Sequence, residues 1–331
     1  MPDTVNGPPP PGAAPPTEHV LIPWATSLSD ACQQALTALD DARRFPTLHR
    51  LWGRLRPADR LEGDEYTLVP PHERVQAAAW GWPTDQPPWA ALLARADGLS
   101  LGEQAWGLMT PCHWHLGHDH FTMLPPDELQ LDAETSRALF DAVAPLFTDE
   151  GWALHWGAPL RWYAVHPVLA DLPTASLDRV VGRNPDLWMA AHPQARLLRR
   201  LQAEVQMLLH QHPLNDEREA RGLARINSFW LSGCGVARPI NGPSPRSVDG
   251  PRQALLQGDV TGWLQAWDAI ERDTLPGLAQ ALEAGRPVQL TLCGERHAVS
   301  LHPAPAPGWW ARLQARWRPP HLRPSDLLAS L

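Results

Sequence analysis

The segment 197–235 constrains the fold more than any other part of the chain. Apolar residues recur at helical spacing over 197–209, and a proline then predicts the end of that helix. The polar stretch 215–222 is expected to form a loop. A buried strand over 226–231 follows, and it runs into a Gly-x-Gly turn at 233–235. Because α/β folds bind ligands beyond the carboxyl ends of their strands, this turn is a candidate ligand site.

Length and charge exclude several classes of protein. The chain has 331 residues, enough for one large domain or two, and its net charge of −8 argues against a nucleic-acid binder. No apolar run reaches the roughly 20 residues that span a bilayer, so we expect no transmembrane segment. The first residues lack the basic and apolar regions of a secretory signal. The scattered cysteines favour reduced thiols and a cytoplasmic location: Cys32, Cys112, Cys234 and Cys293.

The pattern along the chain predicts three parts. Residues 1–18 are rich in Pro, Gly and Ala and are expected to be a disordered tail. Residues 19–105 and 191–331 are expected to form a discontinuous α/β core. Residues 106–190 are expected to form an inserted α+β lobe. Within that lobe we predict a hairpin over 106–124 that turns at Leu116-Gly117, a helix over 135–147 and a strand over 152–165.

In the core, buried or alternating runs predict strands and amphipathic runs predict helices. The strands are expected at 19–25, 288–293 and 297–301, and the helices at 27–39, 45–55, 71–81 and 263–282. Ser27 or Ser29 is expected to cap the helix over 27–39. The Arg- and Trp-rich stretch 309–331 is predicted to be a packed C-terminal helix, with a membrane-surface contact as the alternative.

The segment 212–235 carries a family resemblance. Its pattern is His212, Pro213, Asn215, Arg218, Gly222, Asn227, Trp230, Gly233 and Gly235. This pattern resembles that of the archaeal-type cofactor-independent phosphoglycerate mutases of the alkaline phosphatase superfamily. The chain is also similar to a proteobacterial branch of that family, the regulatory proteins of the RpfE type. The resemblance implies an alkaline-phosphatase-like three-layer α/β core with a smaller inserted α+β lobe.

The same resemblance implies two divalent metals and a Ser or Thr nucleophile, and most of these residues are replaced. The first strand ends in 22–25 without a carboxylate, and His72 stands at the nucleophile position. The segment 256–259 keeps at most one metal ligand, and 294–296 replaces the final metal motif. We therefore predict a degenerate, non-catalytic relative that acts as a regulatory or phosphometabolite-binding protein and needs no cofactor.

Polar residues in the segment before the Gly-x-Gly turn, together with Arg161, which the resemblance places on an arginine of the family, are candidates for binding a small anionic phosphometabolite, because arginine presents a planar fork that matches phosphate. They are Arg161, His212, Asn215, Arg218, Arg221 and Asn227. On this hypothesis Arg218→Ala lowers ligand affinity without unfolding the protein. The alternative is a structural loop in which Asn215 caps a helical turn.

Two alternatives to a binding protein stay open. The first is an active metal-dependent phosphoglycerate mutase or phosphatase with a rearranged Mn²⁺, Mg²⁺ or Zn²⁺ site. Its candidate ligands are His113, His115, His118, His120, Asp259, Glu295 and His297, although the pattern of the four hairpin histidines favours solvated side chains over a metal site. The second is a structural protein that docks an unknown partner through exposed tryptophans and the Arg-rich C-terminus. The chain has 17 tryptophans, an excess that compositional drift also explains.

Overall fold

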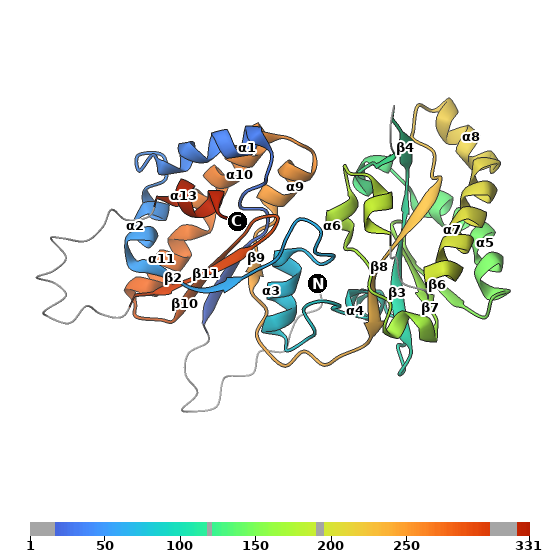
Figure 1. Ribbon diagram of the computed structural model, residues 1–331, viewed down its shortest axis with the longest axis horizontal. Coiled ribbons are helices and arrows are strands. Elements are labelled where there is room, and N and C mark those ends of the chain that lie inside the picture. Colours follow the sequence, from blue (N-terminus) through green and yellow to red (C-terminus); the bar gives the residue numbers. More distant parts are fainter. Residues whose placement is uncertain (1–16, 118–120, 190–194, 305–322) are drawn as a thin grey trace, which may run out of the picture.

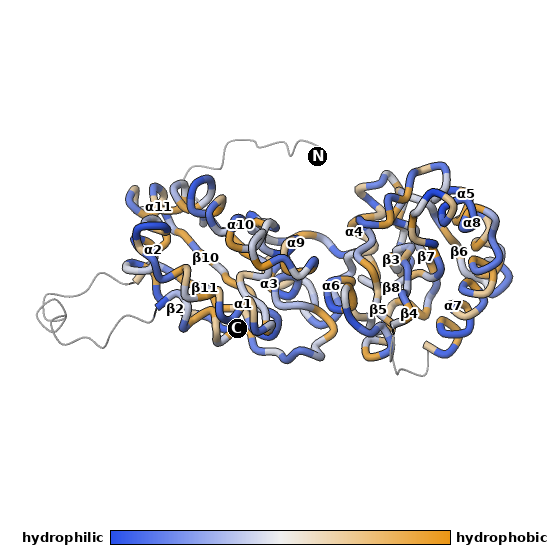
Figure 2. Tube along the Cα trace, turned by 90° about the horizontal axis from the view of Figure 1, so that it is seen from above, coloured by the Kyte–Doolittle hydropathy of each residue, from blue (hydrophilic) through white to orange (hydrophobic). Residues whose placement is uncertain are grey.

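The protein is a mixed α/β structure of two lobes that lie side by side along its long axis (Figure 1). The computed structural model describes residues 17–117, 121–189, 195–304 and 323–331. Seen from above, each lobe is a separate body with its own sheet (Figure 2). Among the described residues, no helix has the length and apolar character needed to cross a bilayer.

The first lobe contains a five-stranded mixed sheet in the order β2-β11-β10-β1-β9. Its strands are β1 (Glu18–Ile22), β2 (Leu55–Leu61), β9 (Arg246–Ser247), β10 (Val288–Cys293) and β11 (Ala298–Pro303). Strand β1 pairs in parallel with β10 and β9, whereas β11 pairs antiparallel with β10 and β2. The parallel strands β1, β9 and β10 therefore end at the same edge of the sheet.

Helices cover both faces of this sheet (Figure 1). They are α1 (Asp30–Ala35), the 3-10 helix η1 (Leu36–Asp40), α2 (Pro46–Arg54), α3 (Pro71–Ala79), α9 (Gly250–Leu256), α10 (Val260–Asp273), α11 (Leu275–Glu283) and α13 (Pro324–Ala329). Alternation along β1 sends Val20 and Ile22 into the main core and Leu21 to the opposite face, where Val75 of α3 packs.

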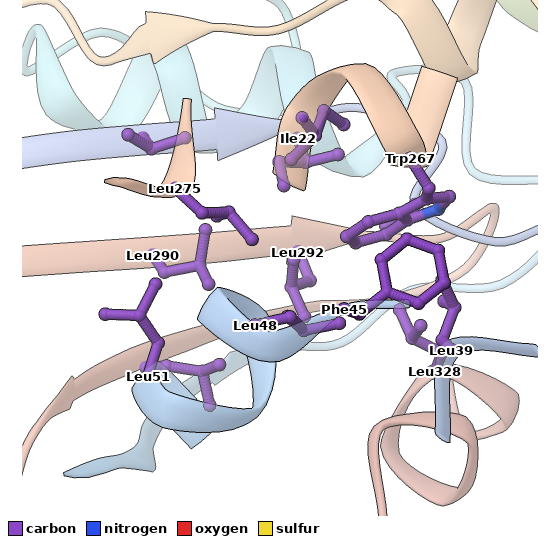
Figure 3. Close-up of a cluster of buried hydrophobic side chains, with 14 of the residues drawn as sticks. Ile22, Leu39, Phe45, Leu48, Leu51, Trp267, Leu275, Leu290, Leu292 and Leu328 are labelled. Carbon is purple, nitrogen blue, oxygen red and sulfur yellow. The ribbon is translucent and has the colours of Figure 1, made fainter. Parts of the chain in front are cut away.

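The main core of the first lobe lies between the sheet and the helices α2, α10 and α11. Figure 3 shows Phe45, which immediately precedes α2, and Leu48 of α2 pointing toward Leu292 of β10 and Trp267 of α10. Trp267 and Phe45 are 1% and 0% exposed, so both rings are fully removed from water. Burial of side chains this large is the main stabilising contribution to such a core.

The second lobe contains a four-stranded antiparallel sheet in the order β6-β7-β3-β8 and a two-stranded sheet β4-β5. Its strands are β3 (Ala105–Cys112), β4 (Trp114–Leu116), β5 (Phe121–Met123), β6 (Ala153–Ala158), β7 (Arg161–Val165) and β8 (Ser228–Val236). Its helices are α4 (Trp89–Ala96), α5 (Ala133–Thr148), α6 (Leu177–Val180), α7 (Ala195–His210) and α8 (Pro213–Ala220), with 3-10 turns η2 (Pro126–Leu129), η3 (Pro167–Ala170) and η4 (Pro185–Trp188). Helices α5 and α7 pack on one face of the large sheet and α4 on the other.

The boundary between core and insertion differs from the predicted one. We expected 191–331 to belong to the core, but β8 pairs with β3 along its whole length and lies in the second sheet. Helix α7 packs on the same sheet, with Leu201, Val205 and Leu209 in its core. Helix α4, from the segment 19–105, packs there too. The second lobe therefore extends from α4 to β8.

Most predicted elements are confirmed within a few residues, and four differ. The predicted loop over 215–222 is mainly helix α8, and the helix expected over 263–282 is two helices that meet at Thr274. The predicted hairpin over 106–124 is confined to β4 and β5, because β3 pairs with β7 and β8 instead. The strand over 152–165 is itself a hairpin of β6 and β7. The predicted tail lies outside the described residues except for its last two positions, and Glu18 already belongs to β1.

The chain enters and leaves the second lobe at one point. The indole nitrogen of Trp82 donates a hydrogen bond to the carbonyl of Pro239 at 2.7 Å. Beside it, the backbone N–H of Asn241 donates to the carbonyl of Trp80 at 3.2 Å. The two connecting segments, before α4 and after β8, therefore run next to each other.

Candidate functional site

A cavity of about 360 Å³ lies at the junction of the two lobes. From the first lobe it is lined by α3 and α9 and by residues near the carboxyl ends of β1 and β9. From the second lobe it is lined by α4, α6 and the middle of β8. Figure 1 shows α3, α4 and α6 between the two sheets. The volume is within the usual range of small-molecule pockets.

The beginning of α3 supplies the polar side chains of the cavity. Pro71 occupies the first helical position, where its missing N–H costs nothing and its fixed φ suits a helix. The next two residues, His72 and Glu73, then project from the first turn, where a negative charge is stabilised by the helix dipole. Both side chains line the cavity. Sequence analysis had placed His72 at the nucleophile position, and its neighbour Glu73 was not singled out.

Glu73 joins the lobes through its carboxylate. It accepts a hydrogen bond from the indole N–H of Trp89 in α4 at 2.8 Å and another from the hydroxyl of Ser176, which precedes α6. Burial raises the pKa of Glu73, and the negative charge of Asp178 raises it further, against the lowering effect of His72 and the two donors. The environment therefore favours the neutral form of this carboxyl more than water does.

Asp178 forms a second link between the lobes. Its carboxylate, 3% exposed, accepts two hydrogen bonds from the guanidinium of Arg252 in α9 and lies 3.3 Å from Nε2 of His72. Burial opposes ionisation of Asp178, but hydrogen bonds from His72 and Arg252 outweigh it and hold the pKa well below its usual range. Nδ1 of His72 has no hydrogen-bond partner among the described residues.

Two glycines of β8 allow α4 to approach the sheet closely. Gly233 has φ +62°, and a Cβ there would lie 3.0 Å from both Cβ of Trp89 and the backbone nitrogen of Ala90. A Cβ on Gly235 would lie 3.0 Å from Cβ of Pro88. The Gly-x-Gly pattern is therefore inside a strand, where glycine permits close packing, and not in a turn beyond the strand as expected. Gly233 nevertheless lines the cavity, as the ligand-site prediction requires.

A third link lies at Glu295, in the segment that replaces the final metal motif of the resemblance. The Glu295 carboxylate, 7% exposed, accepts from the backbone N–H of Leu28 at 2.8 Å and from the guanidinium of Arg183. Its carbonyl accepts from Nη1 of Arg179 at 2.7 Å. Arg179 is 1% exposed, and burial lowers its pKa to about 10, helped by the nearby charge of Arg183. Two guanidinium groups from the second lobe thus contact Glu295 of the first, Arg183 at its carboxylate and Arg179 at its carbonyl.

The predicted anion-binding residues have internal roles. The side-chain amide of Asn215 donates to the carbonyls of Leu209 and Ile226 and accepts from the N–H of Ile226. The Arg218 guanidinium, 2% exposed, donates to the carbonyls of Ala224 and Leu129. Both side chains therefore stabilise the turn between α8 and β8, which matches the structural alternative more closely than the anion site.

The other four predicted anion ligands do not gather around a cavity with them. Arg161 forms a two-point ion pair with Asp97 on the α4 face of the sheet, the face opposite α7. His212 caps α8, and Arg221 is exposed at the other end of that helix. The amide of Asn227 bridges the backbone of Trp114. None of the six residues lines the junction cavity.

The predicted metal ligands are divided between three places. His113 contacts the carbonyl of Arg225, and exposed His115 lies beside it with ring centroids 6.2 Å apart. Asp259 caps α10 by accepting from the N–H of Gly262, and His297 lies 2.9 Å from the Glu62 carboxylate. The remaining candidates in the hairpin, His118 and His120, lie outside the described residues. No group of three or more metal-ligating side chains occurs within the described ranges.

The residues that join the lobes do not stand out in the sequence. Glu73, the pair Ser176 and Asp178, and Arg252 come from three distant segments, and only the fold brings them together. The one local signal was the Pro70-Pro71 pair, which marks a helix start with His72 and Glu73 in its first turn. Nothing in the sequence around Arg252 distinguishes it from a surface arginine.

The tryptophan excess serves packing. Trp80, Trp82 and Trp89 form a cluster at the lobe junction, with ring centroids 4.8 to 5.5 Å apart. No tryptophan is among the exposed large hydrophobic residues of the described part of the chain. The expectation of a docking surface made of exposed tryptophans is therefore wrong for these residues, and Trp309, Trp310 and Trp317 lie outside them.

Comparison with known proteins gives distant likenesses in structure. No protein-family model matches the chain, and no curated protein matches it. Among solved structures, it is similar to a cofactor-independent phosphoglycerate mutase from Thermoplasma acidophilum, with 14% identity, a TM-score of 0.36 and coverage of 86% of this chain and 88% of that one. It is also similar to the PH0037 protein from Pyrococcus horikoshii, with 15% identity, a TM-score of 0.42 and coverage of 89% of each chain.

Proposed function

We propose that this chain is a non-catalytic, phosphoglycerate-mutase-like protein that binds a small molecule in the junction cavity and acts as a regulatory binding protein. The observation that carries the proposal is the environment of Glu295. This residue stands where the resemblance implies a metal ligand, and its carboxylate is bonded by Arg183 and by the N–H of Leu28.

Electrostatics at Glu295 disfavour a divalent cation. Arg183 already neutralises the carboxylate, and Arg179 adds a second positive charge a few ångströms away, through its bond to the Glu295 carbonyl. Like charges at such separations repel strongly in a buried site. The end of β1 adds no carboxylate, because residues 22–25 are Ile, Pro, Trp and Ala. Two-metal phosphoryl transfer requires a cluster of acidic ligands that attract the metals.

His72 is also unsuited to the nucleophile's role that its position implies. Its Nε2 faces the ionised carboxylate of Asp178, which Arg252 holds in place. This arrangement stabilises the closed junction between the lobes. A concave cavity at this junction, with side chains from both lobes, is typical of a ligand-binding site.

Catalysis is tested with purified protein in a coupled assay for conversion of 3-phosphoglycerate to 2-phosphoglycerate. Mn²⁺, Mg²⁺, Co²⁺ and Zn²⁺ are added separately, with EDTA as the control. We expect no turnover with any metal. Turnover that EDTA abolishes would overturn the proposal in favour of the active enzyme with a rebuilt metal site.

The variant Glu295→Gln tests the role of the carboxylate independently of turnover. If Glu295 is an ion-pair partner, the variant loses about 3 kcal/mol of unfolding free energy because two arginines lose their counter-charge. We expect this loss to be the same with Mn²⁺ or EDTA present. If Mn²⁺ raises the unfolding free energy of the wild type but not that of the variant, Glu295 binds metal instead.

A further inference from the structure

The residues that line the junction cavity indicate which class of ligand it binds. This inference about the ligand rests on the proposed binding function. Most of the cavity's lining is apolar, including Val69, Leu92, Leu93 and Leu108. Its charged side chains already have hydrogen-bond partners within the junction. Arg252 is bonded to Asp178, and Glu73 accepts from two donors of the opposite lobe.

Three polar groups in the described wall stay available: Nδ1 of the His72 ring, the amide of Gln76 and the hydroxyl of Ser232. The amide of Gln76 and the hydroxyl of Ser232 line the cavity, and neither forms a side-chain hydrogen bond with any described residue. An amide and a hydroxyl can each donate and accept hydrogen bonds. They can therefore bind a neutral polar group on a ligand, but they offer nothing to compensate the desolvation of a phosphate.

An anion entering this cavity would face the two carboxyl groups of Glu73 and Asp178. Arg252, the arginine in the described lining, already gives two N–H groups to Asp178, and His72 lies against the same carboxylate. We infer that the junction cavity binds an uncharged, largely apolar organic molecule with one neutral polar group, and that it rejects phosphorylated metabolites. This specificity is the reverse of that expected for a phosphoglycerate site.

The inference is tested with two fluorescent probes that share one scaffold. N-phenyl-1-naphthylamine is uncharged, and 1-anilinonaphthalene-8-sulfonate is the same molecule with an added sulfonate. We expect saturable binding of the neutral probe at one site per chain and binding of the sulfonate at least about tenfold weaker, with no displacement by 3-phosphoglycerate.

Two variants place the binding in the cavity. Leu93→Trp fills the cavity from α4, and Leu108→Phe fills it from β3 in case the first variant does not fold. Leu208→Trp is the matched control, because Leu208 is also a half-buried leucine of a helix, α7, but does not line the cavity. We expect at least about tenfold weaker binding of the neutral probe in either cavity variant and no change in the control.

A third variant tests the charge argument. Asp178→Asn removes one negative charge and releases Arg252, so we expect the sulfonate probe to gain about tenfold relative to the neutral one. The control is Asp141→Asn, which removes an exposed aspartate on α5. A preference for the neutral probe that is the same in both variants would contradict the role of the junction charges.

The outcomes separate the two proposals. If the cavity-filling variants bind both probes as the wild type does, the cavity is not the binding site, and the proposed binding function fails. If they lose binding but the wild type binds the sulfonate or 3-phosphoglycerate as tightly as the neutral probe, only the ligand class is wrong.

Discussion

The segment 212–227 and the lobe junction contain the same kinds of polar side chain and use them differently. In the segment, Asn215 and Arg218 give their hydrogen bonds to backbone carbonyls, three of them within the segment 209–226 and the fourth at Leu129. At the junction, His72 keeps one nitrogen without a partner, and Gln76 and Ser232 keep their side chains uncommitted beside a cavity. A cluster of polar residues is a candidate site only to the extent that the fold leaves its hydrogen-bonding capacity unused.

The largest expected loss of stability tests whether Arg218 has a structural role or binds a ligand. Arg218→Ala leaves two buried carbonyls without donors and should cost about 3–5 kcal/mol of unfolding free energy. This is the opposite of the sequence-based expectation that the variant stays folded. Urea unfolding measures the difference, and Arg221→Ala is the control because Arg221 is exposed at the end of the same helix. Equal stability of the two variants would contradict the structural role of Arg218.

The next effect concerns the pH dependence of the junction. The pKa of Asp178 is depressed in the folded state, so its stabilisation is complete above the unfolded pKa near 4 and is lost as the pH falls through the folded pKa. Asp178→Asn should cost about 3 kcal/mol at pH 7, and the gap from the wild type should narrow as the pH falls below about 4. Unfolding curves at pH 7, 5, 4 and 3 test this, with Asp141→Asn as the control. A gap that does not change with pH would mean that the ion pair with Arg252 contributes little.

The smallest expected loss of stability comes from alanine substitutions at one glycine of each region. Gly222 and Gly233 both have positive φ, +72° and +62°, but a Cβ meets nothing within 4 Å at Gly222. At Gly233 it would contact the backbone of α4 at 3.0 Å. We expect Gly222→Ala to cost about 1 kcal/mol from backbone strain alone and Gly233→Ala about 1 kcal/mol more. Thermal unfolding resolves the two, and equal costs would mean that α4 moves away easily.

Local patterns predicted the local structure well. Helices such as α3 and α5 have apolar residues at helical spacing and a proline or aspartate at their starts, and β1 has a short apolar run, so their positions follow from the sequence. Helix α8 was missed because its residues, from Pro213 to Ala220, are mostly polar. The three-residue spacing of Asn215 and Arg218, which puts both on one buried face, was the signal that could have revealed it.

Long-range pairing could not be predicted in the same way. The sequence of β8 is compatible with either lobe, because its residues are buried on both faces of the strand. Its pairing with β3 places it in the second lobe and so sets the domain boundary. The junction has the same difficulty. Glu73 and Asp178 are 105 positions apart in the sequence, and no local pattern indicates that their carboxyl groups lie close together. Their meeting follows from the packing of whole lobes.

The paired connections at Trp82 and Pro239 have a consequence for how the molecule can be divided. Because the second lobe begins and ends at neighbouring points, its two cut ends would already be close together. The segment from α4 to β8 is therefore a natural unit for exchange between proteins. If it is removed, only a short gap has to be closed in the first lobe. Because each sheet is paired within its own lobe, a change in the angle between the lobes at these two connections would unpair no strand.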